Sequence, residues 1–450
     1  MAGKSIRLAE IMAALSHALD MTEGQPAGHC IRGCWMGVQV GRTLGLSTEA
    51  LSDLYYTLLL KDLGCSSNAA RICELYLADD LSFKRDFKMV DTSVSQVLGF
   101  VLSHTGLQAG LAGRFRSVLH ILQHGGTISR ELIETRCQRG AEIARQMHFS
   151  EAVAGAILDL DEHFDGGGKP QGLGGNAISP LAGIALMCQV ADVFFVSGGP
   201  EAARREISRR RGTWFDPVLV DIFLDLSSQS SFWETLSAPD LTDIVLSLEP
   251  AQCVRMADDD YLDDIAAAFA RVIDAKSPFT SGHSERVALF TDMIAEEMGY
   301  GAQQRRWVKR AALLHDIGKL GVSNSILDKN GKLDGDEWVA MKAHASHSEA
   351  ILEKIDVFSD LARVAGAHHE RLDGKGYPRG IGGDDICLDT RIISTADVFD
   401  ALTADRPYRK AMPLSKALAI LHEGAGASHD PLCIAALERA VARADLLDAA

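Results

Sequence analysis

The chain contains an internal repeat, and this repeat constrains its fold more than any other feature of the sequence. Segments of the first half return in the second half in the same order. Self-similarity of this kind indicates a duplicated structural unit. The matching pairs are GHCIRGCWMGV (28–38) with GHSERVALFTD (282–292), LLKDLGCS (59–66) with LLHDIGKL (313–320), HFDGGGKPQGLGG (163–175) with RLDGKGYPRGIGG (371–383), and VADVFF (190–195) with TADVFD (395–400).

The domain organisation follows from this repeat. A chain of 450 residues is longer than one hydrophobic core usually needs, so length alone also favours two domains. We predict a first copy over residues 1–250 and a second copy over 251–450, joined in the polar stretch 247–260. The matched segments lie further apart in the first copy, which predicts an insertion at about 75–125 whose function the sequence does not indicate.

Both copies are predicted to be helical. Outside the turns, apolar residues recur at helical spacing, as in YLDDIAAAFARVIDA (261–275) and ERVALFTDMIAEEM (285–298). Alternating runs typical of strands are nearly absent. The predicted fold class is therefore all-α, a tandem pair of helical bundles.

Composition limits the kinds of molecule that this chain can bind and the compartment in which it can function. The net charge of −16 argues against a nucleic-acid-binding surface, although an anionic substrate remains possible if metal ions supply positive charge. The nine cysteines show no zinc spacing, and their odd number without an export signal indicates a reducing bacterial cytoplasm. The most membrane-like run, 178–196, contains Gln189 and Asp192, so we predict a buried helix and no membrane span.

Histidines and aspartates of the second copy fall at spacings typical of metal ligands. Neutral imidazoles with a few carboxylates are what a cluster of first-row divalent metal ions requires. An aspartate has two oxygens and can bridge two ions, which makes Asp316 the expected bridging ligand. Asp316 paired with Lys319 at a helix end, or His344 exposed on the surface, would be the simpler alternatives. The predicted metal ligands are His283, His315, Asp316, His344, His368, His369 and Asp397.

Substrate contacts are predicted around the same residues. Gly376, Tyr377 and Pro378 follow the adjacent histidines in a glycine-rich loop, where the backbone can approach a ligand closely. Arg406 and Arg409 could bind phosphate oxygens, or could simply be solvated surface charges. Asp400 is expected to brace neighbouring groups.

The first copy has lost most of these ligands. Lys61 stands opposite His315, Arg136 opposite His344, and Leu160-Asp161 opposite the adjacent histidines. The match of VADVFF with TADVFD places Asp192 opposite Asp397. Because cations repel a metal ion, we predict that the first copy folds without metal and has a regulatory or dimerising role.

The segments HDIGK (315–319), HHERLDGKGYP (368–378) and ADVFDALTADRPYR (396–409) closely resemble the HD-GYP domain, a branch of the HD phosphohydrolases. The resemblance covers about 260–420 and, more faintly, the first copy. It implies an all-α domain that hydrolyses cyclic di-GMP to pGpG and often to GMP, with two or three iron or manganese ions. It also implies the seven ligands named above, a phosphate contact at Lys319, and substrate contacts at Arg406 and Arg409.

One departure from the family pattern bears on the metal count. Members with three metal ions have a glutamate four residues before the first histidine, and this chain has Phe279 there. A phenyl ring cannot ligate a metal, so we expect two divalent ions, iron or manganese. Two such ions with two ligand carboxylates would leave the positive charge that attracts a phosphodiester.

The expected function is metal-dependent hydrolysis of cyclic di-GMP in bacterial second-messenger signalling. One alternative is an HD hydrolase that acts on cyclic GMP-AMP or on a linear nucleotide, because no residue indicates a guanine or adenine preference. Another is a non-catalytic cyclic di-GMP receptor, which suits the first copy better than the second. A homodimer is possible, and the sequence does not identify a signalling partner.

Overall fold

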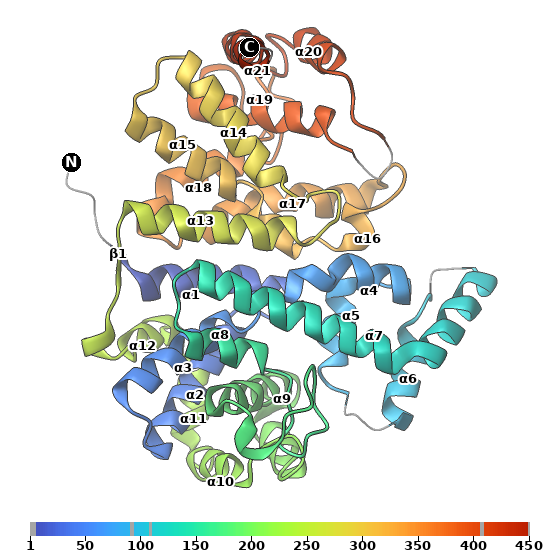
Figure 1. Ribbon diagram of the computed structural model, residues 1–450, viewed down its shortest axis with the longest axis vertical. Coiled ribbons are helices and arrows are strands. Elements are labelled where there is room, and N and C mark those ends of the chain that lie inside the picture. The colour runs from blue at the N-terminus through green and yellow to red at the C-terminus, as the bar shows by residue number, and fades with distance from the viewer. Residues whose placement is uncertain (1–5, 91–93, 108–109, 406–408, 449–450) are drawn as a thin grey trace. The chain divides into compact units, whose positions relative to one another are not determined.

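Helices dominate the computed structural model, which describes residues 6–90, 94–107, 110–405 and 409–448 (Figure 1). Within these ranges the strands are confined to one two-stranded sheet, in which β1 (Ile6–Arg7) pairs antiparallel with β2 (Met256–Ala257). The predicted all-α fold class is confirmed.

The chain forms two compact units, Met1–Tyr261 and Leu262–Ala450. The boundary lies beyond the predicted 250/251, for a reason visible in the hydrogen bonds. Strand β2 pairs with β1, and Leu8 N donates to the carbonyl oxygen of Arg255 at 2.8 Å. Tyr261 Oη donates to the carbonyl oxygen of Met147 at 2.7 Å. These bonds tie the end of the connecting stretch to the first unit.

In the first unit, α2 packs against α1, α3 and α9, and α7 packs against α8. Helix starts are set by side-chain caps such as Ser47, whose oxygen accepts from Ala50 N, and Ser150, which accepts from Val153 N. The helices of this unit are α1 (Leu8–Thr22), α2 (His29–Leu44), α3 (Thr48–Leu60), α4 (Ala69–Tyr76), α5 (Asp80–Phe87), α6 (Val94–His104), α7 (Leu111–Gln146), α8 (Glu151–Leu158), α9 (Pro180–Arg209), α10 (Pro217–Leu226), α11 (Ser230–Leu236) and α12 (Leu241–Ser247), with 3₁₀ turns η1 (Cys65–Asn68), η2 (Gly175–Ala177) and η3 (Ala251–Cys253).

In the second unit, α14 packs against α15, α19 and α21, and α17 packs against α18 and η4. A capping box, in which Asp334 and Glu337 each bond the other's backbone N–H, fixes the start of α17. The helices are α13 (Asp259–Asp274), α14 (His283–Glu297), α15 (Ala302–Leu314), α16 (Asn324–Leu327), α17 (Gly335–Leu352), α18 (Ser359–Ala367), α19 (Leu388–Thr403), α20 (Leu414–Glu423) and α21 (Pro431–Asp448), with 3₁₀ turns η4 (Ile317–Gly321), η5 (Asp356–Phe358) and η6 (Gly383–Asp385).

The sequence repeat is visible in backbone packing. In the second unit, a Cβ on Gly318 would overlap the carbonyl oxygen of His344, so η4 can approach α17 only with glycine there. In the first unit, a Cβ on Gly64 would overlap the carbonyl oxygen of Arg136 in the same way. The paired positions of the repeat therefore perform the same packing task in both copies.

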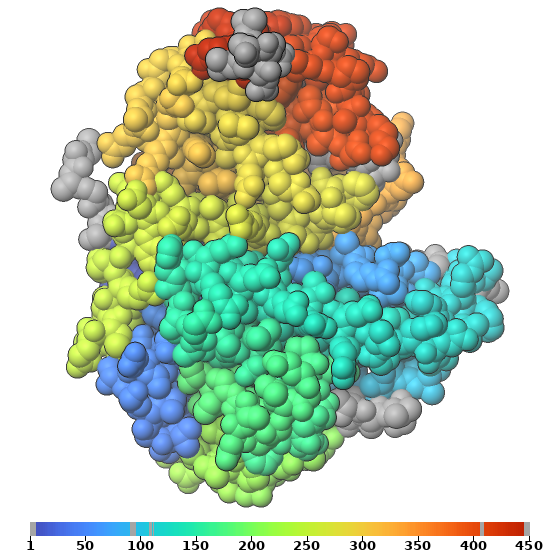
Figure 2. Space-filling model, viewed as in Figure 1, coloured from blue at the N-terminus to red at the C-terminus, as the bar shows by residue number. Residues whose placement is uncertain are grey.

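The insertion of the first unit forms a helical hairpin from α6 and the first half of α7, which stands out from the body of that unit (Figures 1 and 2). A small core of Ile72, Phe83 and Phe100 holds its base. Of the 18 large apolar side chains that are exposed in the described structure, nine lie between Leu77 and Leu122. The insertion is therefore where exposed apolar surface concentrates.

One helix of the described chain, α9, is long and apolar enough to cross a membrane. Two thirds of its most apolar stretch (67%) is buried inside the fold, and its backbone is kinked at Gly199. This burial is typical of a core helix.

The close approach at Gly318 makes a testable prediction. Replacing Gly318 with alanine should destabilise the second unit by about 1–3 kcal/mol and displace His344, because the added methyl group overlaps the α17 backbone. Gly335→Ala is the matched control, since nothing lies within 4 Å of a Cβ there. Urea unfolding of both variants would measure the difference, and equal stability would contradict the packing argument.

Candidate metal centre

The seven predicted ligands come from five different parts of the second unit and meet at one place. His283 begins α14, His315 and Asp316 follow α15, His344 lies on α17, His368 and His369 follow α18, and Asp397 lies on α19. Their ligand atoms form three overlapping groups, and within each group the atoms lie within 4.8 Å of one another. These groups are His283, His315 and Asp397; His315, Asp316 and His368; and His344, His368 and His369.

The carboxylate of Asp316 lies between two pairs of imidazoles. Its Oδ2 is 3.4 Å from His283 Nε2 and 3.3 Å from His315 Nε2. Its Oδ1 is 3.4 Å from His344 Nε2 and 3.7 Å from His368 Nε2. One oxygen therefore faces each pair, which is the arrangement of a carboxylate that bridges two ions.

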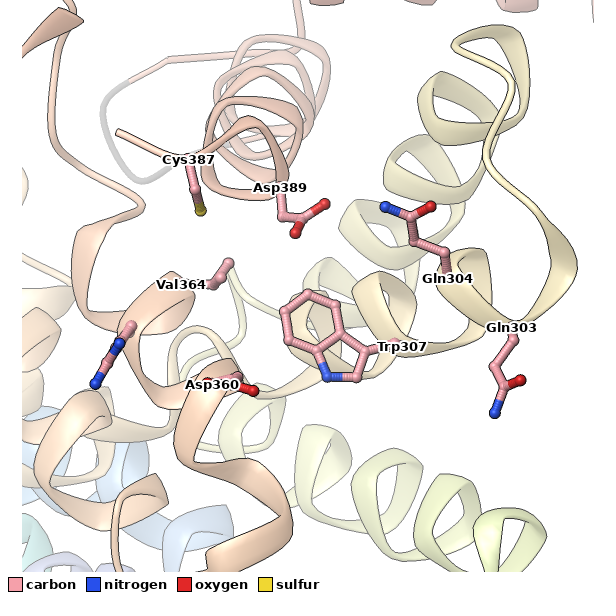
Figure 3. Close-up of a pocket in the computed structure, with 8 residues that line it drawn as sticks. Gln303, Gln304, Trp307, Asp360, Val364, Cys387 and Asp389 are labelled. Carbon is pink, nitrogen blue, oxygen red and sulfur yellow. The ribbon is translucent and has the colours of Figure 1, made fainter. Parts of the chain in front are cut away.

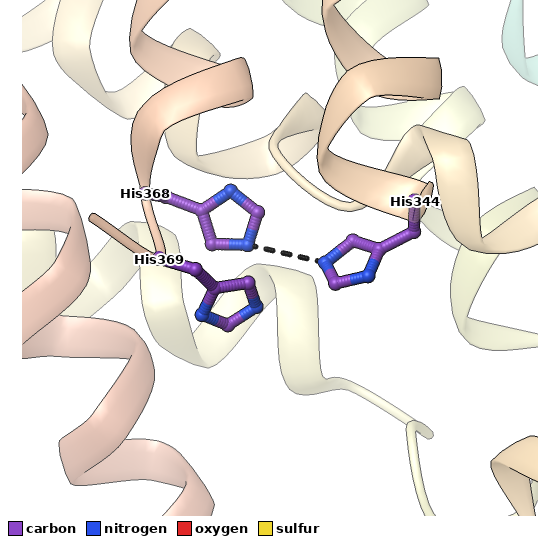
Figure 4. Close-up of side chains that lie close together, drawn as sticks. All are labelled: His344, His368 and His369. Carbon is purple, nitrogen blue, oxygen red and sulfur yellow. Dashed lines mark hydrogen bonds between the residues drawn. The ribbon is translucent and has the colours of Figure 1, made fainter. Parts of the chain in front are cut away.

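The two remaining ligands complete the two sides. Asp397 Oδ1 is 3.4 Å from His283 Nε2 and 3.9 Å from His315 Nε2. On the other side, His344 Nε2 and His368 Nε2 are 3.5 Å apart, and the His369 ring faces the same space (Figure 4). Each side thus gathers nitrogen and oxygen atoms around one position.

The imidazoles are oriented by hydrogen bonds on their outer nitrogens. The Nδ1 atoms of His315, His344 and His368 lie 2.7, 2.5 and 2.5 Å from the carbonyl oxygen three residues earlier in the chain. His283 Nδ1 lies 2.7 Å from Asp400 Oδ2, and Arg286 Nε donates to Asp400 Oδ1 at 2.5 Å. Such contacts leave Nε2 as the ligating atom and orient the ring toward the centre. Asp400 braces its neighbours, as expected.

Three buried ligand atoms fit a bound metal ion. His283 Nε2, His315 Nε2 and Asp316 Oδ1 are buried and have no hydrogen-bond partner among the described residues. A buried polar atom left unsatisfied costs about 1–3 kcal/mol, and a metal ion would satisfy all three. These residues therefore fit a divalent metal cluster.

The ligands differ in protonation state, because burial and neighbouring charges shift their pKa values in different directions. Burial alone would raise the pKa of Asp316, but the positive charges of His315 and Lys319 hold it well below its usual range. The neighbouring imidazoles of His283 and His315 similarly outweigh burial and depress the pKa of Asp397. Burial lowers the pKa of His344 to about 4 and of His368 to about 3, so both are neutral ligands at pH 7.

His283 and His315 behave differently. Burial would lower their pKa values, but the negative charge of the neighbouring carboxylates outweighs it and raises the pKa of His283 to about 10 and of His315 to about 9. Without metal ions, these two rings therefore hold protons where ions would bind.

The glycine-rich loop supports the adjacent histidines. Gly376 packs so closely on the backbone of Glu370 and Arg371 that a Cβ would overlap it. The Tyr377 ring lies 4.7 Å from the His369 ring, and Pro378 follows on the exposed side. The buried side chain of Glu370 accepts from the backbone of this loop, with Oε1 at 2.6 Å from Arg379 N. The sequence did not single out Glu370, although Glu162 holds the same position in the first copy and bonds Gln171 N at 2.6 Å.

The predicted cationic contacts differ in their surroundings. The Lys319 ammonium pairs with Asp316 beside the cluster. The Arg409 guanidinium donates to the carbonyl oxygens of Ala401 at 2.5 Å and Leu402 at 3.0 Å, so these donors brace their own segment. Arg406 lies outside the described residues, and a substrate contact of either arginine stays a prediction.

The first copy has a lysine at the corresponding centre. Lys61 Nζ is 3.0 Å from His29 Nε2 and pairs with Asp62, and all three side chains are buried. Arg136, which replaces His344, pairs with Asp161. An ammonium group thus lies between the two residues that correspond to His283 and Asp316.

A further group in the first copy could hold an ion by geometry alone. Ligand atoms of Glu23, Asp62 and Cys65 lie within 4.8 Å of one another. However, Lys88 Nζ is 2.7 Å from Glu23 Oε2, and Lys61 pairs with Asp62. The carboxylates are therefore already compensated by lysines.

The pairing of Asp192 with Asp397 is wrong. His29 Nδ1 lies 2.7 Å from Asp192 Oδ2, and Arg32 Nε donates to Asp192 Oδ1 at 2.5 Å. These are the contacts that Asp400 makes in the second copy, so Asp192 corresponds to Asp400, and Gln189 stands opposite Asp397. The repeated ADVF motif is displaced by nearly one helical turn, whereas the ungapped continuation from the glycine-rich loop gives the register that the contacts show.

A shallow cavity of about 640 Å³ lies elsewhere on the second unit, around Trp307, Val364 and Asp389 (Figure 3). It opens between α15, α18 and the start of α19. None of the seven ligand candidates lines it, so cavity size does not locate the cluster.

Comparison with known proteins identifies the family. The family described as HD domain matches residues 108–218 and 267–432, together more than half of the chain and in both units. The 3'3'-cGAMP-specific phosphodiesterase 3 of Vibrio cholerae serotype O1 is 54% identical over 434 residues, which cover 96% of this chain and 94% of that protein. A crystal structure of a cyclic GMP-AMP specific phosphodiesterase of Vibrio cholerae is 49% identical, covers 97% of this chain and 98% of that chain, and superposes with a TM-score of 0.67.

A second kind of relative matches a smaller part. The cyclic di-GMP phosphodiesterase response regulator RpfG of Xanthomonas campestris pv. campestris is 41% identical over 172 residues, which cover 38% of this chain and 46% of that protein. The chain belongs to the HD domain family. More narrowly, it is a member of the HD-GYP branch, and the comparisons support phosphodiesterase activity.

The protons on His283 and His315 make a pH-dependent prediction. Because both pKa values lie above 7 in the metal-free protein, loading with Mn²⁺ at pH 7 should release protons. Apparent affinity should rise by about tenfold per pH unit for each proton displaced as pH increases from 6 to 8. Calorimetry in buffers of different ionisation enthalpy would count the protons, and binding without release would contradict the assignment.

The lysine at the first centre makes a stability prediction. Lys61→Met should destabilise the first unit by about 3–5 kcal/mol, because it leaves the buried Asp62 carboxylate without its closest cation. Arg71→Met is the control, since the Arg71–Glu74 pair is exposed and should contribute less than about 1 kcal/mol. Denaturant unfolding of both variants provides the measurement. Equal stability would show that Asp62 does not depend on Lys61.

Proposed function

We propose that this chain is a metal-dependent phosphodiesterase that opens a 3',3'-cyclic dinucleotide, with 3'3'-cGAMP as the first candidate substrate. The observation that carries the chemistry is the Asp316 carboxylate between two pairs of imidazoles. Support for the substrate comes from the 3'3'-cGAMP-specific relative, which is 54% identical over nearly the whole length of both chains.

The proposed centre holds two divalent ions, iron or manganese. His283, His315 and Asp397 would hold one ion, and His344, His368 and His369 the other, with Asp316 shared between them. Bound divalent ions would polarise the phosphate and lower the pKa of a water molecule. Phe279 offers no ligand for a third ion.

The side chains around the ions have separate tasks in this proposal. Lys319, next to Asp316, would neutralise charge that develops on the non-bridging phosphate oxygens. Tyr377 and Gly376 keep the His369 segment in place. Asp400 and the backbone carbonyl groups hold the imidazoles in the orientation that ligation requires.

Cyclic di-GMP is the second candidate. The HDIGK and HHERLDGKGYP segments and the RpfG relative favour it. That relative is matched over 38% of this chain only, whereas the 3'3'-cGAMP-specific protein is matched over 96%. We therefore place cyclic di-GMP second among the substrates, ahead of a linear nucleotide. Hydrolysis of either cyclic dinucleotide is favoured over a non-catalytic receptor function.

For the first copy we propose a regulatory or dimerising role without metal. Lys61 and Arg136 occupy the positions of His315 and His344. Lys61 forms an ion pair with Asp62, and Arg136 forms one with Asp161. A homodimer and a bacterial cytoplasmic location belong to the same proposal. The nine free cysteines fit a reducing compartment.

A substrate panel tests the function. Protein purified without oxygen and loaded with Fe²⁺ or Mn²⁺ should convert 3'3'-cGAMP to a linear dinucleotide faster than cyclic di-GMP, as followed by chromatography of the products. A faster reaction with cyclic di-GMP would make cyclic di-GMP the preferred substrate and 3'3'-cGAMP the second. Absence of turnover with both would reject the proposal.

Asp316→Asn is the companion variant, because it keeps the shape of the side chain and removes the charge. Since loss of outer hydrogen-bonding partners of metal ligands typically costs 10–100-fold, loss of the shared ligand should reduce metal retention and turnover by more than about 100-fold. Asp384→Asn, at a fully exposed position of η6, is the matched control. A metal-loaded, active Asp316→Asn protein would refute the bridging role.

A further inference from the structure

A large aromatic side chain is exposed beside the metal centre. Trp338 lies near the start of α17, on the same helix as His344, and is 46% exposed. An indole ring left this open to water gives up much of the stabilisation that its burial would supply. No role predicted from the sequence accounts for it.

Trp338 is the outer member of a series of rings that begins at the metal ligands. The His369 and Tyr377 rings are 4.7 Å apart, and the Tyr377 and Trp338 rings are 6.1 Å apart. His344 lies 6.4 Å from Tyr377. The rings therefore lead from the centre to an exposed indole at its rim.

The position of Trp338 is fixed by the start of the helix. Asp334 and Glu337 form the capping box of α17, and Lys329 Nζ donates to Glu337 Oε1 at 2.6 Å. Trp338 follows Glu337 directly, on a regular helix and not on a loop. A platform on such an element needs little ordering when a ligand binds.

A nucleobase is the chemical group that matches this surface. In a cyclic dinucleotide, each phosphate is joined through a ribose to a purine. A phosphate bound at the metal centre therefore places a purine only one ribose away, close to the exposed ring of Trp338. Aromatic side chains bind bases by stacking, and stacking tolerates any base because every base has a π face.

We infer that Trp338 is the stacking platform for one purine of the substrate. This inference rests on the proposed function and deepens it. Trp338 contributes to substrate binding and not to bond cleavage, and it favours guanine and adenine to a similar extent.

The test compares Trp338→Ala and Trp338→Phe in the full-length, metal-loaded protein. Trp338→Ala should raise KM for 3'3'-cGAMP and for cyclic di-GMP by roughly 5- to 100-fold and change kcat by less than about threefold. Trp338→Phe should recover most of the loss, since a phenyl ring also stacks. Val339→Ala, at the adjacent exposed position, is the matched control.

A phosphodiester without a nucleobase separates stacking from a structural role. With methyl p-nitrophenyl phosphate, Trp338→Ala should change kcat/KM by less than about twofold, because this substrate has no base to stack. If Trp338→Ala reduces kcat/KM equally for all substrates, Trp338 has a structural role in packing against Tyr377, and the inference is overturned. An unchanged KM for both dinucleotides would overturn it as well.

Failure of the proposed function has a different signature. Wild-type protein would then hydrolyse the base-free diester but neither cyclic dinucleotide, and the inference would fall with the substrate class. If wild-type protein turns over a dinucleotide and Trp338→Ala does so with the same KM, only the inference fails.

Discussion

The charge of one buried carboxylate organises each copy of this chain. In the second unit, Asp316 is buried among four imidazoles, and each of its oxygens faces two of them. A carboxylate in that position requires compensating positive charge, because an unpaired buried ion is strongly destabilising. Protons on His283 and His315 and the Lys319 ammonium supply it in the metal-free protein, and divalent ions would replace those protons. The same interaction thus links the stability of the unit to its proposed chemistry.

The first copy solves the same electrostatic problem with a lysine. Asp62 corresponds to Asp316, and the ammonium group of Lys61 bonds both Asp62 and His29. The fold keeps its buried acid, its glycine contact at Gly64 and the brace from Asp192 to His29. What differs is the source of positive charge: in the first copy it is the side chain of Lys61, which is part of the chain itself. Loss of metal ligands and retention of the fold are therefore compatible, because the cation that the core needs is supplied by the chain.

The residues that could be predicted from the sequence are those whose chemistry is visible in residue type and spacing. The helical class followed from apolar periodicity, and the ligand candidates followed from histidines and aspartates at metal-ligand spacing, most of which the first copy lacks. The convergence of His283, His344 and His368 depends on packing between helices that are distant in sequence, and the structure supplies it. Arg409 shows the limit, because a cation near a site can serve its own backbone carbonyls instead of a ligand.

Two features could not be read from sequence for physical reasons. The register of Asp192 was ambiguous because the ADVF match and the ungapped continuation from the glycine-rich loop give alignments that differ by nearly one helical turn, and the contact with His29 decides between them. Trp338 is conspicuous only through its exposure, which depends on packing, since a tryptophan is on average highly buried.

The position of Trp338 also bears on why base preference is hard to read from the residues. A stacking surface binds both purines, so discrimination between guanine and adenine must come from hydrogen bonds to base edges, made by groups whose identity the metal-binding motif does not specify. A motif that fixes the chemistry of the phosphate therefore leaves the choice of base to residues outside it.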